Sequence, residues 1–124
     1  MTDIPKVSPI VVDAISDMLL SDQGMRRPPD KAAHMLAVIC ALHKKDQPFP
    51  RREEMAEAIN ASISTVDAAL STRLSEGYLS IEMDTEQGNV ARRNGVVRHK
   101  YYIPSPQLLE VYEQAERRLK KAKS

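Results

Sequence analysis

The segment 53–81 constrains the fold more than any other part of this 124-residue chain. Apolar residues recur at helical spacing over 51–59 and again over 63–76. Asn60 stands between these two runs, and asparagine tolerates the left-handed backbone conformation better than most non-glycine residues. Ser62 is well placed to act as the N-cap of the second helix. The segment therefore predicts two short helices that are joined by a tight turn.

An alternating segment follows the second helix. Gly77 suits a left-handed helix stop, and residues 78–83 then show the period-two pattern of a half-buried strand. The apolar side of this strand consists of Leu79, Ile81 and Met83. A second strand over about 96–103 is expected to pair back on the first. A helix-turn-helix that continues into a β-hairpin wing is used mainly to place a helix in the DNA major groove.

Three more helices are expected outside this segment. An N-terminal helix covers 8–22, a central helix runs from Asp30, its expected N-cap, to about Lys45, and a C-terminal helix covers 105–122. The central helix is apolar nearly all round, which is typical of a helix enclosed by the rest of a core. The sequence thus predicts a mainly α fold with a small β-hairpin wing. We expect a single domain over 1–124, with a DNA-binding core over 30–104.

Composition excludes several classes of protein. Hydrophobic residues make up 42% and charged residues 28% of the chain, as in an ordinary globular domain. No apolar run approaches the roughly 18 residues that a membrane span requires, and no signal sequence is recognisable. The single cysteine, Cys40, fits a small core residue in a reducing cytoplasm. The three histidines are scattered, so we expect no metal site, no cofactor and no enzymatic activity.

Positive charge is concentrated in particular segments, although the net charge is only +1. The segment 87–103 contains no acidic residue. Its basic residues are Arg92, Arg93, Arg98 and Lys100. An acid-free basic segment in the loop and return strand of a hairpin is suited to contact a polyanion.

The chain resembles winged helix-turn-helix bacterial transcriptional regulators of the MarR, GntR and PadR type. The residues that carry the resemblance are Glu54, Met55, Ala56, Ile59, Asn60, Ala61, Ser62, Thr65, Val66, Ala69, Leu70, Gly77 and Leu79, together with the strand 100–104. Arg73 departs from the pattern, because it occupies a position that is often apolar in these proteins. We therefore expect Leu74 to provide the inward contact there. The resemblance implies a fold with extra N-terminal and C-terminal helices around a DNA-binding unit.

The first and last helices each have one apolar face. These faces consist of Val11, Ile15 and Leu19 in the first helix and of Leu108, Tyr112, Ala115 and Leu119 in the last. Each face either packs on its own domain or pairs with a second subunit. The resemblance to dimeric regulators favours pairing in a homodimer.

The expected DNA contacts come from three places. In the second helix of the motif, we expect Val66, Ala69, Leu70 and Leu74 to face inward. The residues at its start and on its outward side are Ser62, Ser64, Thr65, Asp67, Ala68, Ser71 and Thr72. Arg51 and Arg52 lie at the start of the first helix of the motif and suit phosphate contacts. Arg92 and Arg93 near the wing tip, with Arg98 and Lys100 on the return strand, complete the expected interface.

The resulting hypothesis is a cytoplasmic, sequence-specific regulator that binds double-stranded DNA, acts as a repressor by occupying a promoter and carries no membrane segment. Two alternatives remain open. The chain is also consistent with an accessory or architectural DNA-binding factor of a mobile element, acting in excision, conjugation or replication. The weak basicity of the second helix is, in turn, consistent with a winged helix that binds a protein partner.

Overall fold

The computed structural model describes residues 4–24, 26–27, 29–84 and 99–123. Over these residues the chain is mainly helical and contains a two-stranded antiparallel hairpin. The elements in chain order are α1 (Pro9–Gln23), α2 (Asp30–Lys44), α3 (Arg52–Ala58), α4 (Ile63–Ser75), β1 (Leu79–Asp84), β2 (His99–Pro104) and α6 (Pro106–Lys123). The expected mainly α fold with a hairpin is therefore confirmed.

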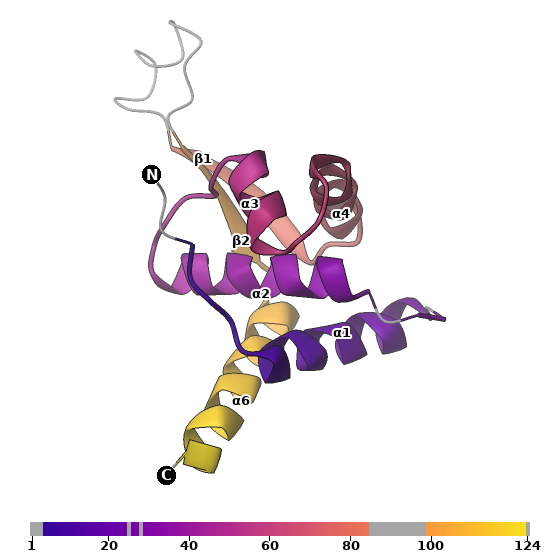
Figure 1. Cartoon of the computed structure of the whole chain (residues 1–124), viewed down its shortest axis with the longest axis vertical. Coiled ribbons are helices and arrows are strands. Elements are labelled where there is room, and N and C mark those ends of the chain that lie inside the picture. Colours follow the sequence, from indigo (N-terminus) through magenta and orange to yellow (C-terminus); the bar gives the residue numbers. More distant parts are fainter. Residues whose placement is uncertain (1–3, 25, 28, 85–98, 124) are drawn as a thin grey trace, which may run out of the picture.

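Helix α2 forms the centre of the molecule. It lies across the middle in Figure 1, with α3, α4 and the hairpin on one side and α1 and α6 on the other. Residues 35–42 of α2 are each at most 7% exposed, so two full turns are enclosed on every side. The prediction of a central helix is confirmed. Cys40 lies in this stretch, and its burial raises the pKa of the thiol, which keeps it protonated and unreactive.

Helix α1 begins and ends at residues with strong local preferences for helix ends. The Ser8 hydroxyl accepts a hydrogen bond from the backbone N–H of Ile10 at 3.2 Å, and Pro9 is the first helical residue. Gly24 ends the helix in the left-handed conformation, with φ 61°. Helix α2 differs slightly from expectation. Asp30 is its first helical residue rather than its cap, and Pro29 occupies the cap position.

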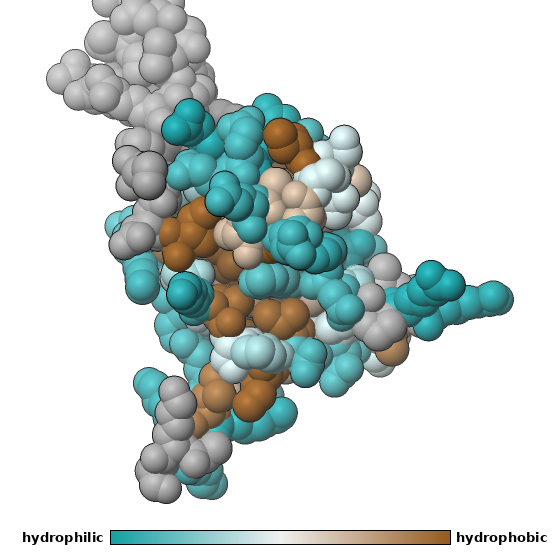
Figure 2. Space-filling model, viewed as in Figure 1, coloured by the Kyte–Doolittle hydropathy of each residue, from teal (hydrophilic) through white to brown (hydrophobic). Residues whose placement is uncertain are grey.

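The apolar faces of α1 and α6 pack within the chain itself. Val11, Ile15 and Leu19 of α1 are buried, as are Leu108, Tyr112 and Ala115 of α6, while Leu119 is partly buried. Of the two interpretations that the sequence left open, the structure shows packing on the same domain. Figure 2 shows further apolar surface on the lower half of this view, over α1 and α6.

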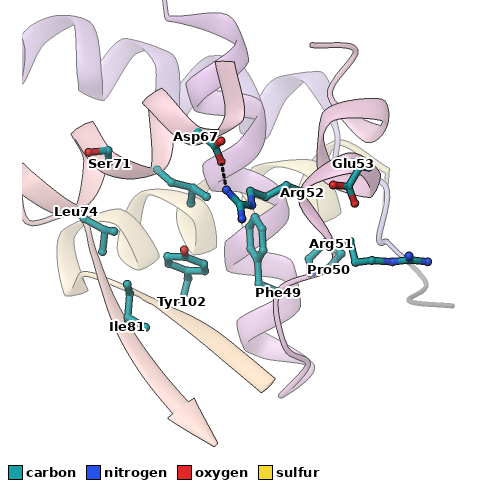
Figure 3. Close-up of a pocket in the computed structure, with 11 residues that line it drawn as sticks. Phe49, Pro50, Arg51, Arg52, Glu53, Asp67, Ser71, Leu74, Ile81 and Tyr102 are labelled. Atoms are coloured by element: carbon teal, nitrogen blue, oxygen red, sulfur yellow. Dashed lines mark hydrogen bonds and ion pairs between the residues drawn. The ribbon is translucent and has the colours of Figure 1, made fainter. Parts of the chain in front are cut away.

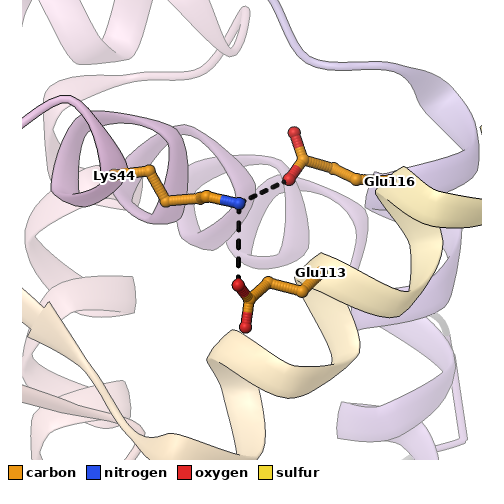
Figure 4. Close-up of polar contacts among 3 residues, drawn as sticks. All are labelled: Lys44, Glu113 and Glu116. Carbon is orange, nitrogen blue, oxygen red and sulfur yellow. Dashed lines mark hydrogen bonds and ion pairs between the residues drawn. The ribbon is translucent and has the colours of Figure 1, made fainter. Parts of the chain in front are cut away.

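A lysine clamp fixes α6 against the C-terminal end of α2 (Figure 4). The Nζ of Lys44 lies 3.0 Å from Oε1 of Glu116 and 3.6 Å from Oε2 of Glu113. The same Nζ lies 5.8 Å from the centre of the Tyr112 ring. The hydrogen bond to Glu116 raises the pKa of Lys44, so the ammonium group stays charged. Exposed ion pairs add little stability, so the clamp chiefly sets the register of α6.

A second polar group ties the hairpin to α1 and α6. The Tyr78 hydroxyl donates a hydrogen bond to Oδ2 of Asp22 at 2.9 Å and accepts one from Nε2 of Gln23 at 3.1 Å. Nε2 of Gln107 donates to the same Asp22 oxygen at 2.6 Å. The start of the hairpin is thereby held to the end of α1 and the start of α6.

We predict that Ile15→Ala lowers the free energy of unfolding by about 2–5 kcal/mol, because Ile15 is 0% exposed and its truncation leaves a cavity. Ile10→Ala is the matched control in the same helix, because Ile10 is 47% exposed. We expect its effect to stay within about 0.5 kcal/mol. Urea unfolding at two protein concentrations measures both. Equal effects, or an effect of Ile15→Ala that vanishes at low concentration, would contradict a role for Ile15 in the monomer core.

Candidate nucleic-acid interface

The turn between α3 and α4 forms as the sequence predicts. Asn60 adopts the left-handed conformation with φ 55°. The Nζ of Lys31 in α2 donates a hydrogen bond to the backbone carbonyl of Ile59 at 3.1 Å, where α3 ends. This bond satisfies a carbonyl that the helix leaves open. The central helix thus holds the end of α3 from which the turn departs.

The start of α4 is capped by Ser62, as predicted. Its hydroxyl accepts a hydrogen bond from the backbone N–H of Thr65 at 3.1 Å and lies 2.9 Å from the Thr65 hydroxyl. Both side chains were expected to contact DNA. In the structure both are exposed but are engaged with each other at the first turn of the helix. Their first role is therefore to fix the start of α4.

The side chains on the outward face of α4 are short, and all of them except Asp67 are uncharged. Ser64, Ala68, Ser71 and Thr72 are all exposed, as expected. The surface over α4 is correspondingly pale in Figure 2, neither strongly hydrophilic nor strongly hydrophobic. Ile63 adds an exposed apolar side chain at the start of the helix, with 43% of its surface accessible.

Arg52 and Asp67, which were both expected to contact DNA, form an ion pair with each other. Nη1 of Arg52 lies 3.1 Å from Oδ1 of Asp67, so the start of α3 is joined to α4 (Figure 3). This interaction raises the pKa of Arg52. The neighbouring Arg51 is also exposed, and its Nε lies 3.7 Å from Oε1 of Glu54. Glu54 in addition accepts a hydrogen bond from the backbone N–H of Arg51 at 3.1 Å, which stabilises the start of α3.

A cleft of about 650 Å³ lies between α4, the start of α3 and the hairpin. The apolar side chains that line it are those of Phe49, Pro50, Leu70, Leu74 and Ile81. Tyr102 of β2 also lines the cleft, and its ring meets that of Phe49 edge-on, with 4.8 Å between ring centroids. Figure 3 shows Arg52 reaching across toward Asp67 beside this cleft. No sequence pattern indicated that Phe49 and Tyr102 meet, because they are distant along the chain.

Two expectations about side-chain direction were wrong. The first concerns Arg73 of α4, which is only 4% exposed, whereas Leu74 is only partly buried. Val66, Leu70 and Arg73 follow one another at spacings of four and three, so Arg73 continues the buried face. Glu76 makes this burial possible, because its Oε1 lies 3.0 Å from Nε of Arg73.

The second wrong expectation concerns the strand. Ile81 was expected on a half-buried side, but it is 42% exposed. It is paired with Tyr102 in the hairpin and lines the open cleft, where no further element covers it within the described part of the chain. Tyr78, which directly precedes β1, and Leu79, its first residue, are both buried.

Most of the basic residues expected in the wing, namely Arg92, Arg93 and Arg98, lie outside the described residues. Lys100 is placed through its backbone in β2, opposite Met83 of β1. The antiparallel register runs from Leu79 opposite Pro104 to Asp84 opposite His99. The described part of the hairpin thereby extends away from α2 (Figure 1).

The comparisons with known proteins assign no family. No protein-family model matches the chain, and a search of curated proteins finds no relative. Among the helices of the described residues, none is long and apolar enough to cross a membrane. The function must therefore be inferred from the residues and their geometry.

We predict that Ser62→Ala lowers the free energy of unfolding by about 1 kcal/mol, because it removes an N-cap that accepts a backbone N–H. Ser64→Ala is the control, since Ser64 is an exposed residue inside the same helix, where alanine is well tolerated. Chemical denaturation of both variants measures the difference. If Ser62→Ala were no more destabilising than Ser64→Ala, Ser62 would not be acting as a cap.

Proposed function

We propose that this protein is a sequence-specific DNA-binding regulator of the winged helix-turn-helix type, which represses transcription by occupying a promoter. The observation that supports this best is the order α3, turn, α4 and antiparallel hairpin, with one side of α4 open to solvent. A helix used for recognition needs one face on the core and the other free for base edges. In this proposal α4 is the recognition helix and the hairpin is the wing.

The side chains of α4 suit limited direct readout. Ser64, Ser71 and Thr72 carry hydroxyls that donate or accept hydrogen bonds, and the Ala68 methyl suits contact with a thymine methyl. The first two turns contain no arginine or lysine to bind guanine. Most of the affinity must then come from phosphate contacts made by basic residues outside α4.

Arg51 and Arg52 at the start of α3 are the described candidates for such phosphate contacts. Both are exposed, and each is held by an ion pair that a phosphate can replace. The arginines of the wing segment are the others. Repression by promoter occupancy requires no catalysis. A protein that stays bound to the promoter excludes polymerase sterically.

The proposal includes a homodimer. A symmetric dimer would place two recognition helices about one turn of DNA apart and would require a palindromic site. Because the predicted dimer residues are mostly buried in their own chain, side chains that remain exposed would have to form the contact.

A protein-binding role is the second candidate. It is favoured by the exposed Ile63 at the start of α4 and by the pairing of Arg52 with Asp67, which removes positive charge from this surface. An architectural role in a mobile element is the third, and it differs from the first in sequence preference alone.

Fluorescence anisotropy tests these functions directly. The purified protein is titrated into the DNA upstream of its own gene and into a scrambled duplex, at two salt concentrations. We expect tight, salt-sensitive binding that prefers the upstream DNA. Equal binding to both duplexes would favour the architectural role. Absence of binding at low salt would refute a DNA-binding function and favour a protein partner.

We predict that replacing Arg92 and Arg93 with alanine weakens binding to all duplexes and lowers the salt slope by about one for each phosphate that the wing no longer neutralises. The matched control replaces the exposed adjacent pair Arg117 and Arg118, which removes the same charge from α6, a helix on the other side of α2 from α4. Anisotropy over a series of salt concentrations measures both variants. An equal decrease in both would indicate that net charge, rather than the wing, is responsible.

We predict that Ser64→Ala alters sequence preference, because it removes a hydroxyl that faces the base edges and changes no charge. The measurement is anisotropy against a set of duplexes with single base-pair substitutions. An unchanged ranking of these duplexes would refute a role for Ser64 in readout.

A further inference from the structure

Asp67 is the charge that α4 presents to solvent. The helix contains two charged residues, and the other, Arg73, is buried beside Glu76. The side chain of Asp67 is 44% exposed and lies on an otherwise uncharged surface, which is made mainly of serine, threonine and alanine. A carboxylate at this place opposes the approach of a polyanion, so its presence on a proposed DNA-binding helix requires a reason.

The ion pair with Arg52 supplies part of that reason. It uses Nη1 of Arg52, and the side chains of Arg52 and Asp67 are 60% and 44% exposed. Exposed pairs of this kind contribute little to stability, because solvent screens them. Both partners are accessible, so the pair can open without unfolding any part of the protein. A phosphate that needs Arg52 must first compete with Asp67.

We propose that Asp67 is a specificity-determining residue, which withholds Arg52 from the phosphates of arbitrary duplexes and releases it on the correct sequence. This role rests on the proposed DNA-binding function. Cytosine presents an amino donor at its major-groove edge, and a carboxylate is a suitable acceptor for it. On a correct site, this hydrogen bond offsets the opening of the ion pair with Arg52. On a site that presents guanine or thymine at this position, Asp67 faces acceptor atoms and is repelled by them, so an unfavourable interaction discriminates against that site.

Asp67→Asn tests the proposal, because it removes the charge and keeps the size of the side chain. We expect its affinity for a scrambled duplex to rise roughly two- to fivefold, the range set by the strength of an exposed ion pair. Its affinity for the preferred upstream DNA should stay level or fall, so that the preference for that DNA decreases. Asp67→Ala should act in the same direction, which excludes a new hydrogen bond made by the asparagine amide.

Asp17→Asn is the matched control. Asp17 is an exposed residue of α1, and α1 lies on the opposite side of α2 from α4 (Figure 1). This variant makes the same change in net charge away from the proposed interface. If Asp67→Asn and Asp17→Asn alter both affinities equally, the effect is one of net charge, and the proposal is refuted.

A double variant tests whether Asp67 acts through Arg52. In an Arg52→Ala background, Asp67→Asn should raise the affinity for the scrambled duplex by less than it does in the natural protein. An undiminished rise would show that Asp67 does not restrain Arg52. The two possible failures are distinguishable. If the natural protein binds no DNA, the proposed function fails together with this inference, whereas unchanged discrimination in Asp67→Asn overturns the inference alone.

Discussion

The structure depends on the enclosure of α2. Eight consecutive residues of this helix, 35–42, are almost without exposed surface, so apolar groups must cover it on all sides. Burial of such side chains is the main favourable contribution to folding in a domain of this size. The covering elements divide into two groups, with α1 and α6 on one side and α3, α4 and the hairpin on the other (Figure 1). The proposed interface therefore rests on the buried central helix.

Polar contacts then fix the position of each covering element on α2. Lys31 holds the end of α3, and Lys44 holds α6 through two glutamates. Tyr78 joins the start of the hairpin to Asp22 at the end of α1. Each contact contributes only modestly to the free energy of folding, but each fixes a different end of the central helix or of a neighbouring element. Together they favour one arrangement of elements among the many that apolar burial alone would permit.

Charge pairing decides which residues are available for function. Arg73 is an arginine in the proposed recognition helix, but its burial beside Glu76 removes it from any surface. Arg52 is exposed, yet its guanidinium is held by Asp67. Side chains that look equivalent in the sequence thus differ in how readily they reach a phosphate. The proposed interface around α4 is therefore only weakly basic. In the proposed function, such a surface favours discrimination between DNA sequences over binding by bulk charge.

The sequence by itself determined where several of the helices begin and end, and the tertiary structure alone decided what each face contacts. Ser8, Gly24, Asn60, Ser62 and Gly77 act through their own conformational preferences or through hydrogen bonds to residues a few positions away, so their effects are readable without the fold. The apolar character of α2 likewise predicted its central place. Periodicity, however, identifies an apolar face but not its partner, so it left open whether α1 and α6 pack on their own domain, as the structure shows.

The same limit explains the residues whose direction was predicted wrongly. The burial of Arg73 depends on a glutamate at the right distance, and the exposure of Ile81 depends on an uncovered cleft. The Arg52–Asp67 pair joins residues from two helices, and their approach follows from the way α3 and α4 are packed. Such contacts arise from packing between elements, which local sequence does not specify.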